Sequence, residues 1–224
     1  MQIGIDLGAT KIESVVLDDN GKKIVRAREK SPENYEKTLA SIKLIIESLE
    51  KKFNKSFNIG VCHPGSISNE TGLLKNAHNS PWLNHKPFGS DISKILDRNI
   101  LCENDANCFA LSEAFDGSAK NYKIVFGIIL GSGCGGGLIV NKKIVKGANA
   151  ITGEWGHNGL PFSGLLDGEI KNNKTIEDYV SGKGLEKLFK EKFNEELTTK
   201  EIFSKINDKD YKYKKFIDDF ANRL

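Results

Sequence analysis

The sequence lacks the features that mark membrane, secreted and zinc-ribbon proteins. No run of apolar residues approaches the ~18 that a membrane-spanning helix needs. The first residues, Met1 to Asp6, are typical of a strand and not of a signal peptide. No Cys-x-x-Cys pair, and therefore no zinc-ribbon spacing, occurs among the four cysteines, Cys62, Cys102, Cys108 and Cys134. We therefore expect reduced thiols and a cytoplasmic location.

The composition has no strong bias toward charge of one sign. The 224 residues are 38% hydrophobic and 28% charged, with a formal net charge of +3. Lysines are frequent in the C-terminal third, but acidic residues accompany them, which is typical of a solvated helical surface. We therefore expect neither a nucleic-acid partner nor a membrane partner. The length suits one large domain or two small lobes.

Alternating apolar residues predict a strand–loop–strand unit at the start of the chain. Strands are expected at residues 3–7, 13–17 and 23–28, with a hairpin turn at 18–21. Ser31 and Pro32 are typical of a helix N-cap and first helical position, and a helix with one buried stripe should follow. Residues 58–62 then form a strand parallel to the first.

The opening unit recurs later in the sequence. Residues 126–133 align with residues 3–10, and each copy continues as strand, turn and strand. The repeat predicts two lobes of similar topology, each directing a glycine-rich hairpin at a shared cleft. Asp6 of the first copy is replaced by Ile129 in the second, so the two loops differ in chemistry. Two unrelated hairpins with turn glycines are the alternative.

Gly131 to Gly137 contains five glycines in seven residues. A backbone without Cβ atoms can approach and surround an anion with its N–H groups. The loop lacks the Gly-Lys-Ser/Thr of a Walker A motif, and a strand rather than a helix follows it, unlike a Rossmann loop. A phosphate-binding hairpin remains, with a flexible turn as the alternative. Asp6, at the end of the first strand, would require a cation such as Mg²⁺ beside the phosphates of a nucleotide.

Two further segments carry polar groups suited to sugar chemistry. Asp105 lies between a short strand at 100–102 and a helix that begins near Ala106, where the helix dipole favours its ionised form. It is either a base for a hydroxyl proton or only a helix N-cap. Glu154 and His157, between glycines, suit hydrogen bonds to neighbouring sugar hydroxyls, unless the histidine is structural.

Together these segments resemble the ROK family of sugar kinases and sugar-sensing repressors, over roughly residues 1–190. The resemblance rests on Asp6 to Lys11, Pro64-Gly65, Glu103 to Asn107, Gly131 to Gly137 and Gly153 to His157. It implies an α/β protein with the actin-like ATPase (ribonuclease H-like) fold, with two βββα-type lobes around a cleft. We expect the N-terminal lobe to span residues 1–107 and the C-terminal lobe residues 108–224.

The resemblance also implies roles for individual residues. Asp105 would be the general base toward a primary sugar hydroxyl. Sugar-binding positions would be Gly65, Asn79, Asn104, Glu154, His157 and Glu177. The ATP phosphates would be held by Asp6, Gly8, Thr10, Lys11, Ser132 and Gly133, with Mg²⁺ carried by ATP near Asp6. The expected partners are therefore a hexose and ATP.

Within the family the sequence is most similar to the bacterial manno(fructo)kinases. Residues 65–68 and 82–84, together with Leu160-Pro161, carry this likeness. It implies transfer to the 6-hydroxyl of fructose. An N-acetylglucosamine or glucose kinase, or an inactive sugar-binding protein, is the alternative; the stretch from Asn104 to Ala114 is shared with N-acetylglucosamine kinases. An acetate-kinase-like enzyme ranks last. The chain begins on a strand without the helix-turn-helix of the family's repressors.

Three departures from the family pattern affect these expectations. Ala9 replaces a glycine, which requires a negative φ there. Residues 158–175 contain no cysteine, and Thr175 stands where the last zinc ligand is expected, so structural zinc is not expected and another group must orient His157. No strand is predicted after residue 175. We therefore expect an incomplete second lobe with an exposed apolar face, and a homodimer when the protein is full length.

Overall fold

The computed structural model describes residues 1–159, 174–206, 211–222 and 224. Its N-terminal sheet has the strand order β3-β2-β1-β4-β7. The antiparallel strands are β1 (Gln2–Leu7), β2 (Lys11–Leu17) and β3 (Lys23–Lys30), followed by the parallel strands β4 (Asn58–His63) and β7 (Leu101–Asn104). The predicted strands and the parallel pairing of β1 with β4 are confirmed.

Helix α1 (Tyr35–Phe53) covers one face of this sheet, and its Ile42 and Ile46 are fully buried against the core that contains Ile3 and Ile5 of β1. The predicted N-cap at Ser31 is wrong. The N-cap is Asn34, whose side chain accepts the N–H of Lys37 at 3.0 Å. Ser31 instead donates its N–H to the carbonyl of Thr10, which keeps the chain extended beyond β3.

Short elements connect β4 to β7. A two-stranded hairpin consists of β5 (Ser66–Ile67) and β6 (Leu74–Lys75). The 3₁₀ turn η1 (Pro81–Leu83) and helix α2 (Phe88–Ile95) follow, and the buried Leu83 and Phe88 join the N-terminal core.

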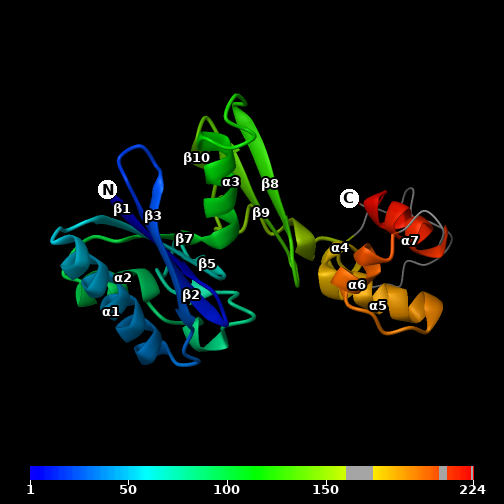
Figure 1. The fold of residues 1–224 in the computed structure, drawn as a ribbon, viewed down its shortest axis with the longest axis horizontal. Coiled ribbons are helices and arrows are strands. Elements are labelled where there is room, and N and C mark those ends of the chain that lie inside the picture. Colours follow the sequence, from blue (N-terminus) through cyan, green and yellow to red (C-terminus); the bar gives the residue numbers. More distant parts are fainter. Residues whose placement is uncertain (160–173, 207–210, 223) are drawn as a thin grey trace.

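The second sheet has the order β10-β9-β8 among the described residues, with β8 (Ile124–Leu130), β9 (Cys134–Val140) and β10 (Lys143–Ile144). This is the predicted repeat of the opening unit. Helix α3 (Asp105–Phe115) packs on the sheet through small residues: a Cβ at Gly127 would lie 2.6 Å from the Cβ of Ala110. Figure 1 shows α3, β8 and β9 between the N-terminal sheet and the C-terminal helices.

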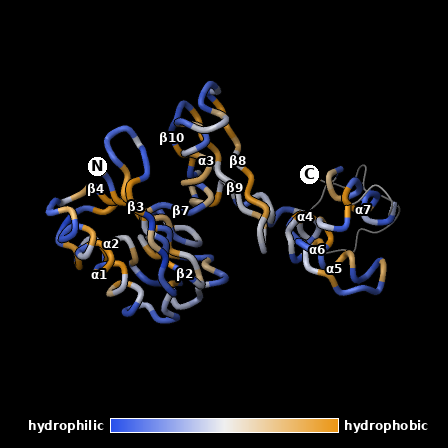
Figure 2. The backbone as a smooth tube through the Cα atoms, in the orientation of Figure 1, coloured by the Kyte–Doolittle hydropathy of each residue, from blue (hydrophilic) through white to orange (hydrophobic). Residues whose placement is uncertain are grey.

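One row of side chains on β8 is apolar and exposed. Its members are Ile124, Phe126, Ile128 and Leu130, between 41% and 69% exposed. The hydrophobic character of this strand is visible in Figure 2. The expected exposed apolar face is therefore present on this strand.

The C-terminal helices form a separate aromatic core. They are α4 (Glu177–Val180), α5 (Gly182–Phe193), α6 (Thr199–Ser204) and α7 (Tyr211–Ala221). Phe189 is fully buried and contacts the rings of Phe193, Tyr213 and Phe216. Phe216 of the last helix belongs to this cluster, and Ile217 and Phe220 pack against it.

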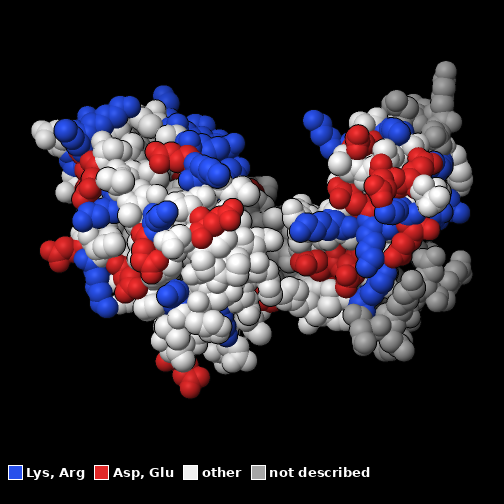
Figure 3. Space-filling model, turned by 90° about the horizontal axis from the view of Figure 1, so that it is seen from below, with Lys and Arg blue, Asp and Glu red and all other residues white. Residues whose placement is uncertain are grey.

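The surface of these helices mixes both signs of charge, as Figure 3 shows. Across the described ranges, no helix combines the length and the apolar character that crossing a membrane would require.

Candidate functional site

Asp105 occupies the first position of α3, directly after β7. The helix N-cap is Asn104, whose side-chain oxygen accepts the N–H of Asn107 at 3.1 Å. The N-cap alternative for Asp105 is therefore excluded. Its Oδ1 accepts the N–H of Ala106 at 2.9 Å and the side-chain amide of Asn104 at 3.0 Å. These contacts hold one carboxylate oxygen at the start of the helix.

The environment of Asp105 raises the pKa of its carboxyl group. Desolvation by the surrounding protein is the main cause, although the side chain itself stays exposed. The N–H of Ala106 acts in the opposite direction, and the carboxylates of Asp6 and Glu154 add to the increase. The sequence predicted that the helix dipole would favour the ionised form. The net effect is the reverse, because desolvation and two neighbouring negative charges outweigh the dipole. A carboxylate with a raised pKa is a better proton acceptor near neutral pH.

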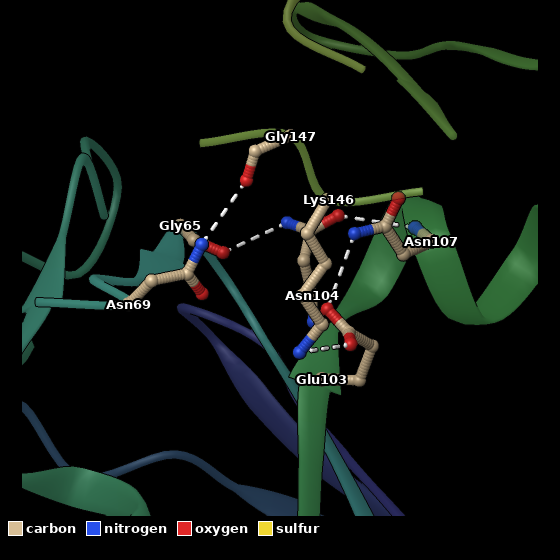
Figure 4. Close-up of polar contacts among 7 residues, drawn as sticks. All are labelled: Gly65, Asn69, Glu103, Asn104, Asn107, Lys146 and Gly147. Atoms are coloured by element: carbon tan, nitrogen blue, oxygen red, sulfur yellow. Dashed lines mark hydrogen bonds and ion pairs between the residues drawn. The ribbon is translucent and has the colours of Figure 1, made fainter. Parts of the chain in front are cut away.

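Asn104 and Gly65, both predicted to bind sugar, are joined by a hydrogen bond. The Asn104 amide donates to the Gly65 carbonyl at 2.9 Å (Figure 4). Gly65 has φ +72°, and a Cβ there would lie 2.3 Å from the Lys75 carbonyl oxygen. Only glycine therefore allows the loop after β4 to approach β6 this closely.

Glu103 holds Asn104, Asn107 and Lys146 together, a role that the sequence did not predict. Its carboxylate pairs with the Lys146 ammonium at 2.7 Å and accepts the Asn104 N–H at 2.9 Å and the Asn107 amide at 3.1 Å (Figure 4). Although burial opposes it, these donors, Lys146 first, lower the pKa of Glu103. No sequence signal marks Lys146, because its partner lies more than 40 residues away.

The loop after β10 is fastened to the N-terminal part of the chain. The Asn69 amide donates to the carbonyls of Gly147 at 3.0 Å and Ala148 at 3.1 Å. Lys75 donates to the Asn149 carbonyl at 3.0 Å. These contacts fix the start of the segment that leads to Glu154, and Figure 4 shows the Asn69 contact beside the Gly65 loop.

Glu154 and His157 are placed by close packing between glycines. A Cβ at Gly153 would lie 1.9 Å from the carbonyl oxygen of Gly136 in β9, so the two backbones are in direct contact. Glu154 precedes the 3₁₀ turn η2 (Trp155–His157), and the Trp155 indole donates to the Gly135 carbonyl at 2.9 Å. The segment therefore lies directly against the glycine-rich strand.

Two contacts orient His157. Its Nδ1 lies 3.7 Å from Oε2 of Glu154. The ring of His78, from the loop that also carries Asn79, packs edge-on against it with centroids 5.7 Å apart and an interplanar angle of 77°. The segment without cysteines, residues 158–175, falls largely within residues 160–173, outside the described residues. Leu160-Pro161 also falls there. Among the described residues, Glu154 and His78 contact the ring.

The two glycine loops are tight hairpin turns. In the first, Gly8 donates its N–H to the Lys11 carbonyl at 2.9 Å, and Ala9 does not have a positive φ, as its side chain requires. Thr10 and Lys11 are exposed beside this turn. In the second, Gly131 donates to the Gly133 carbonyl at 2.9 Å, with Ser132 exposed at the tip.

Glu177 lies at the second loop. Its Oε2 accepts the N–H of Cys134 at 2.7 Å, and a Cβ at Gly133 would lie 2.6 Å from the same oxygen. The contacts therefore associate Glu177 with the second glycine loop, and its predicted contact with sugar stays a prediction.

Asp6 completes an acidic centre at the end of β1. It is close enough to Asp105 to raise the pKa of that residue, and the Cys62 thiol lies 3.7 Å from its Oδ1. Within the described ranges, no three His, Cys, Asp or Glu side chains are arranged to hold a metal ion by themselves. The arrangement fits Mg²⁺ bound mainly through nucleotide phosphates, since that ion uses one or two carboxylates in such sites.

Comparisons with known proteins identify the family and the relatives of this chain. A family model described as "ROK family" matches residues 2–224. The N-acetyl-D-glucosamine kinase of Histophilus somni is 36% identical over 231 residues, covering 98% of this chain and 75% of its own length. That of Pectobacterium atrosepticum is 36% identical over 234 residues, covering 100% of this chain and 77% of its own. Both relatives are named for N-acetyl-D-glucosamine, the acceptor in our alternative prediction. Neither name supports the narrower prediction of a fructokinase.

Solved structures agree on the fold. The ROK hexokinase of Thermus thermophilus superposes with a TM-score of 0.84 at 24% identity, covering 99% of this chain and 74% of its own. A ROK family glucokinase of Streptomyces griseus, solved with glucose and AMPPNP, gives a TM-score of 0.76 at 24% identity and covers 99% and 76%. The predicted actin-like ATPase fold is confirmed.

Proposed function

The chain belongs to the ROK family, and on that premise we propose that it is an ATP-dependent sugar kinase that phosphorylates the 6-hydroxyl of a hexose. The observation that carries the proposal is the position of Asp105. Its carboxylate has a raised pKa, accepts a hydrogen bond from the amide of Asn104 and is near enough to the carboxylate of Asp6 to feel its charge. A base in this position can accept the hydroxyl proton as the sugar oxygen attacks phosphorus.

The proposed sugar site surrounds Asp105. Asn104, fixed by Glu103 and Gly65, and Glu154, fixed by the glycine contact of Gly153, present an amide and a carboxylate to ring hydroxyls. His157 contributes an imidazole in contact with Glu154 and His78, and Asn79 follows His78 in the chain. Glu177 joins this set if closure brings it from the second glycine loop toward the sugar.

The proposed nucleotide site uses the two hairpin turns. Gly8, Thr10 and Lys11 on one side, and Ser132 and Gly133 on the other, would supply backbone and side-chain donors to phosphate oxygens. Mg²⁺ carried on ATP would offset the negative charge of the nearby carboxylates. Catalysis would then depend mainly on positioning and on charge neutralisation, as phosphoryl transfer does in general.

N-acetyl-D-glucosamine is the acceptor that we propose first. The relatives of that name are 36% identical to this chain over nearly its whole length. Fructose is the second candidate, because residues 65–68 and 82–84 resemble the manno(fructo)kinases. Both acceptors offer a primary hydroxyl to Asp105, so the chemistry is the same and only the ring contacts differ.

Coupled release of ADP tests the proposal. The purified chain is assayed with ATP, Mg²⁺ and, separately, N-acetyl-D-glucosamine, fructose, glucose and mannose. We expect turnover with the highest kcat/KM on N-acetyl-D-glucosamine. A higher value on fructose would reverse the order of acceptors and keep the mechanism. A folded chain that turns over none of the four, yet binds one by calorimetry, would replace the kinase with a sugar-binding protein.

A further inference from the structure

His63 is a buried histidine that the proposed mechanism does not use. It is the last residue of β4, directly before the Pro64-Gly65 loop, and only 1% of its surface is exposed. Its ring packs edge-on against the buried Phe88 of α2, with centroids 5.7 Å apart and an interplanar angle of 67°. Because a buried polar ring is costly without hydrogen bonds, the contacts of its two nitrogens indicate what the residue does.

One ring nitrogen of His63 contacts the loop that follows it. Nδ1 lies 3.2 Å from the carbonyl oxygen of Pro64. A carbonyl oxygen only accepts hydrogen bonds, so Nδ1 has to carry the ring hydrogen and donate it. Nε2 is then an unprotonated acceptor. This second nitrogen is buried, and no hydrogen-bond donor in the described part of the chain reaches it. The bond to Pro64 is therefore the polar contact that the ring makes there.

The surroundings keep this imidazole neutral. Burial is the main cause of a lowered pKa for His63, and the positive charge of Lys146 acts in the same direction. The Pro64 carbonyl and the Glu103 carboxylate act in the opposite direction without reversing the change. A neutral ring has a single N–H, so His63 donates one hydrogen bond, and the geometry directs it to Pro64.

The bond from His63 begins a short series of contacts that ends at Asp105. His63 pairs in register with Asn104 across the parallel strands β4 and β7. The Pro64 carbonyl lies in the rigid peptide plane that leads to Gly65, and the Gly65 carbonyl accepts the Asn104 amide at 2.9 Å (Figure 4). The same Asn104 nitrogen donates to Oδ1 of Asp105 at 3.0 Å. The ring therefore acts on the carbonyl next to the one that holds Asn104.

Gly65 makes such a restraint necessary. Its φ is +72°, and glycine has access to more backbone conformations than any other residue. A neighbouring carbonyl that is held by a buried and closely packed ring removes part of this freedom. The alternative is that His63 only fills the core beside Phe88, in which case its replacement should alter stability and leave the site unchanged.

We propose that His63 is a positioning residue for the sugar: its Nδ1–H holds the Pro64 carbonyl and, through the Gly65 carbonyl, fixes the Asn104 amide at the proposed sugar site. The effect on sugar binding rests on the proposed function, whereas the tautomer of His63 and its bond to Pro64 do not. Asp105 keeps a separate hydrogen bond from the Ala106 N–H. His63 therefore affects the affinity for sugar more than it affects kcat.

Two substitutions of His63 separate positioning from packing. His63→Asn places an amide nitrogen where Nδ1 was, so it keeps the donor but leaves a cavity beside Phe88. His63→Leu fills a similar volume but removes the donor. We expect Tm to fall further in His63→Asn, whereas KM for the sugar rises by about two- to tenfold in His63→Leu alone, with kcat nearly unchanged in both. His85→Asn, at an exposed histidine of the same lobe, is the matched control and should keep the wild-type Tm and KM.

A KM that follows Tm, rising in His63→Asn and not in His63→Leu, would reduce His63 to a packing residue and overturn the proposal. If the wild type binds sugar without turning it over, the calorimetric Kd replaces KM with the same expected pattern, and the missing turnover counts against the kinase alone.

Nitrogen-15 NMR of the histidine rings tests the geometry without any kinase assay. Long-range proton–nitrogen spectra of the labelled chain distinguish the two neutral tautomers, and the spectrum of His63→Leu identifies the His63 signals by their loss. We expect a protonated Nδ1 and an unprotonated Nε2 at neutral pH. A hydrogen on Nε2, whether in the other neutral tautomer or in a charged ring, would overturn the proposal.

Discussion

Substitution of Gly153 by alanine tests how the sugar-binding segment is positioned. The new Cβ would lie 1.9 Å from the Gly136 carbonyl oxygen and 2.5 Å from its carbon, whereas real Cβ contacts stay above 3.0 Å. Both partners are backbone atoms, so the segment and β9 must separate by about 1 Å. Overpacking of this kind costs about 1–3 kcal/mol, and a displacement of that size lowers catalytic efficiency by about 10²-fold.

The effect on stability follows from the size of the chain. For a protein of this length, 1 kcal/mol changes Tm by about 2–4 °C, so Gly153→Ala should lower Tm by about 2–12 °C. Gly60→Ala is the matched control, because its Cβ would meet nothing within 4 Å in the described structure. Melting curves and kcat/KM are measured for both variants. Equal Tm and kcat/KM for Gly153→Ala and Gly60→Ala would refute the reasoning.

Three further predictions concern Asp105 and two residues that support the candidate site. Glu103→Gln should lower stability by about 1.5–3 kcal/mol at pH 7, and the difference should vanish as pH falls through the lowered pKa of Glu103, read from Tm against pH. Asp105→Asn should raise the free energy of unfolding slightly at pH 7, by less than about 1 kcal/mol because the Asp105 side chain is exposed, with no gain below pH 3.8, since the folded pKa is raised. His78→Ala should raise KM for the sugar about two- to tenfold, and His78→Phe should not.

Much of the fold follows from local patterns. Alternating apolar residues and turn signals predict both strand–loop–strand units, and right-handed crossover predicts the parallel pairing of β1 with β4. The start of α1 was misplaced because Ser31 and Asn34 are both good N-caps. The choice depends on the long-range hydrogen bond from Ser31 to Thr10, which no local pattern contains.

The sequence suggests the chemical groups of the candidate site but not the residues that hold them in place. Asp105, Glu154 and His157 stand out by residue type and by the glycines around them. Glu103, Lys146, Asn69 and His78 do not, because each acts through a contact with a distant segment. The sign of the pKa change at Asp105 was also missed, since Asp6 and Glu154 approach it only in the folded chain.

The role of Asp105 as the base is tested most directly by comparing kcat with sugar affinity in Asp105→Asn. The substitution keeps the size of the side chain and an oxygen that can accept the Ala106 N–H. We predict that kcat falls by about 10²–10⁴-fold while the calorimetric Kd for the sugar changes only a few-fold. A variant that folds, binds sugar and keeps the wild-type kcat would contradict the account.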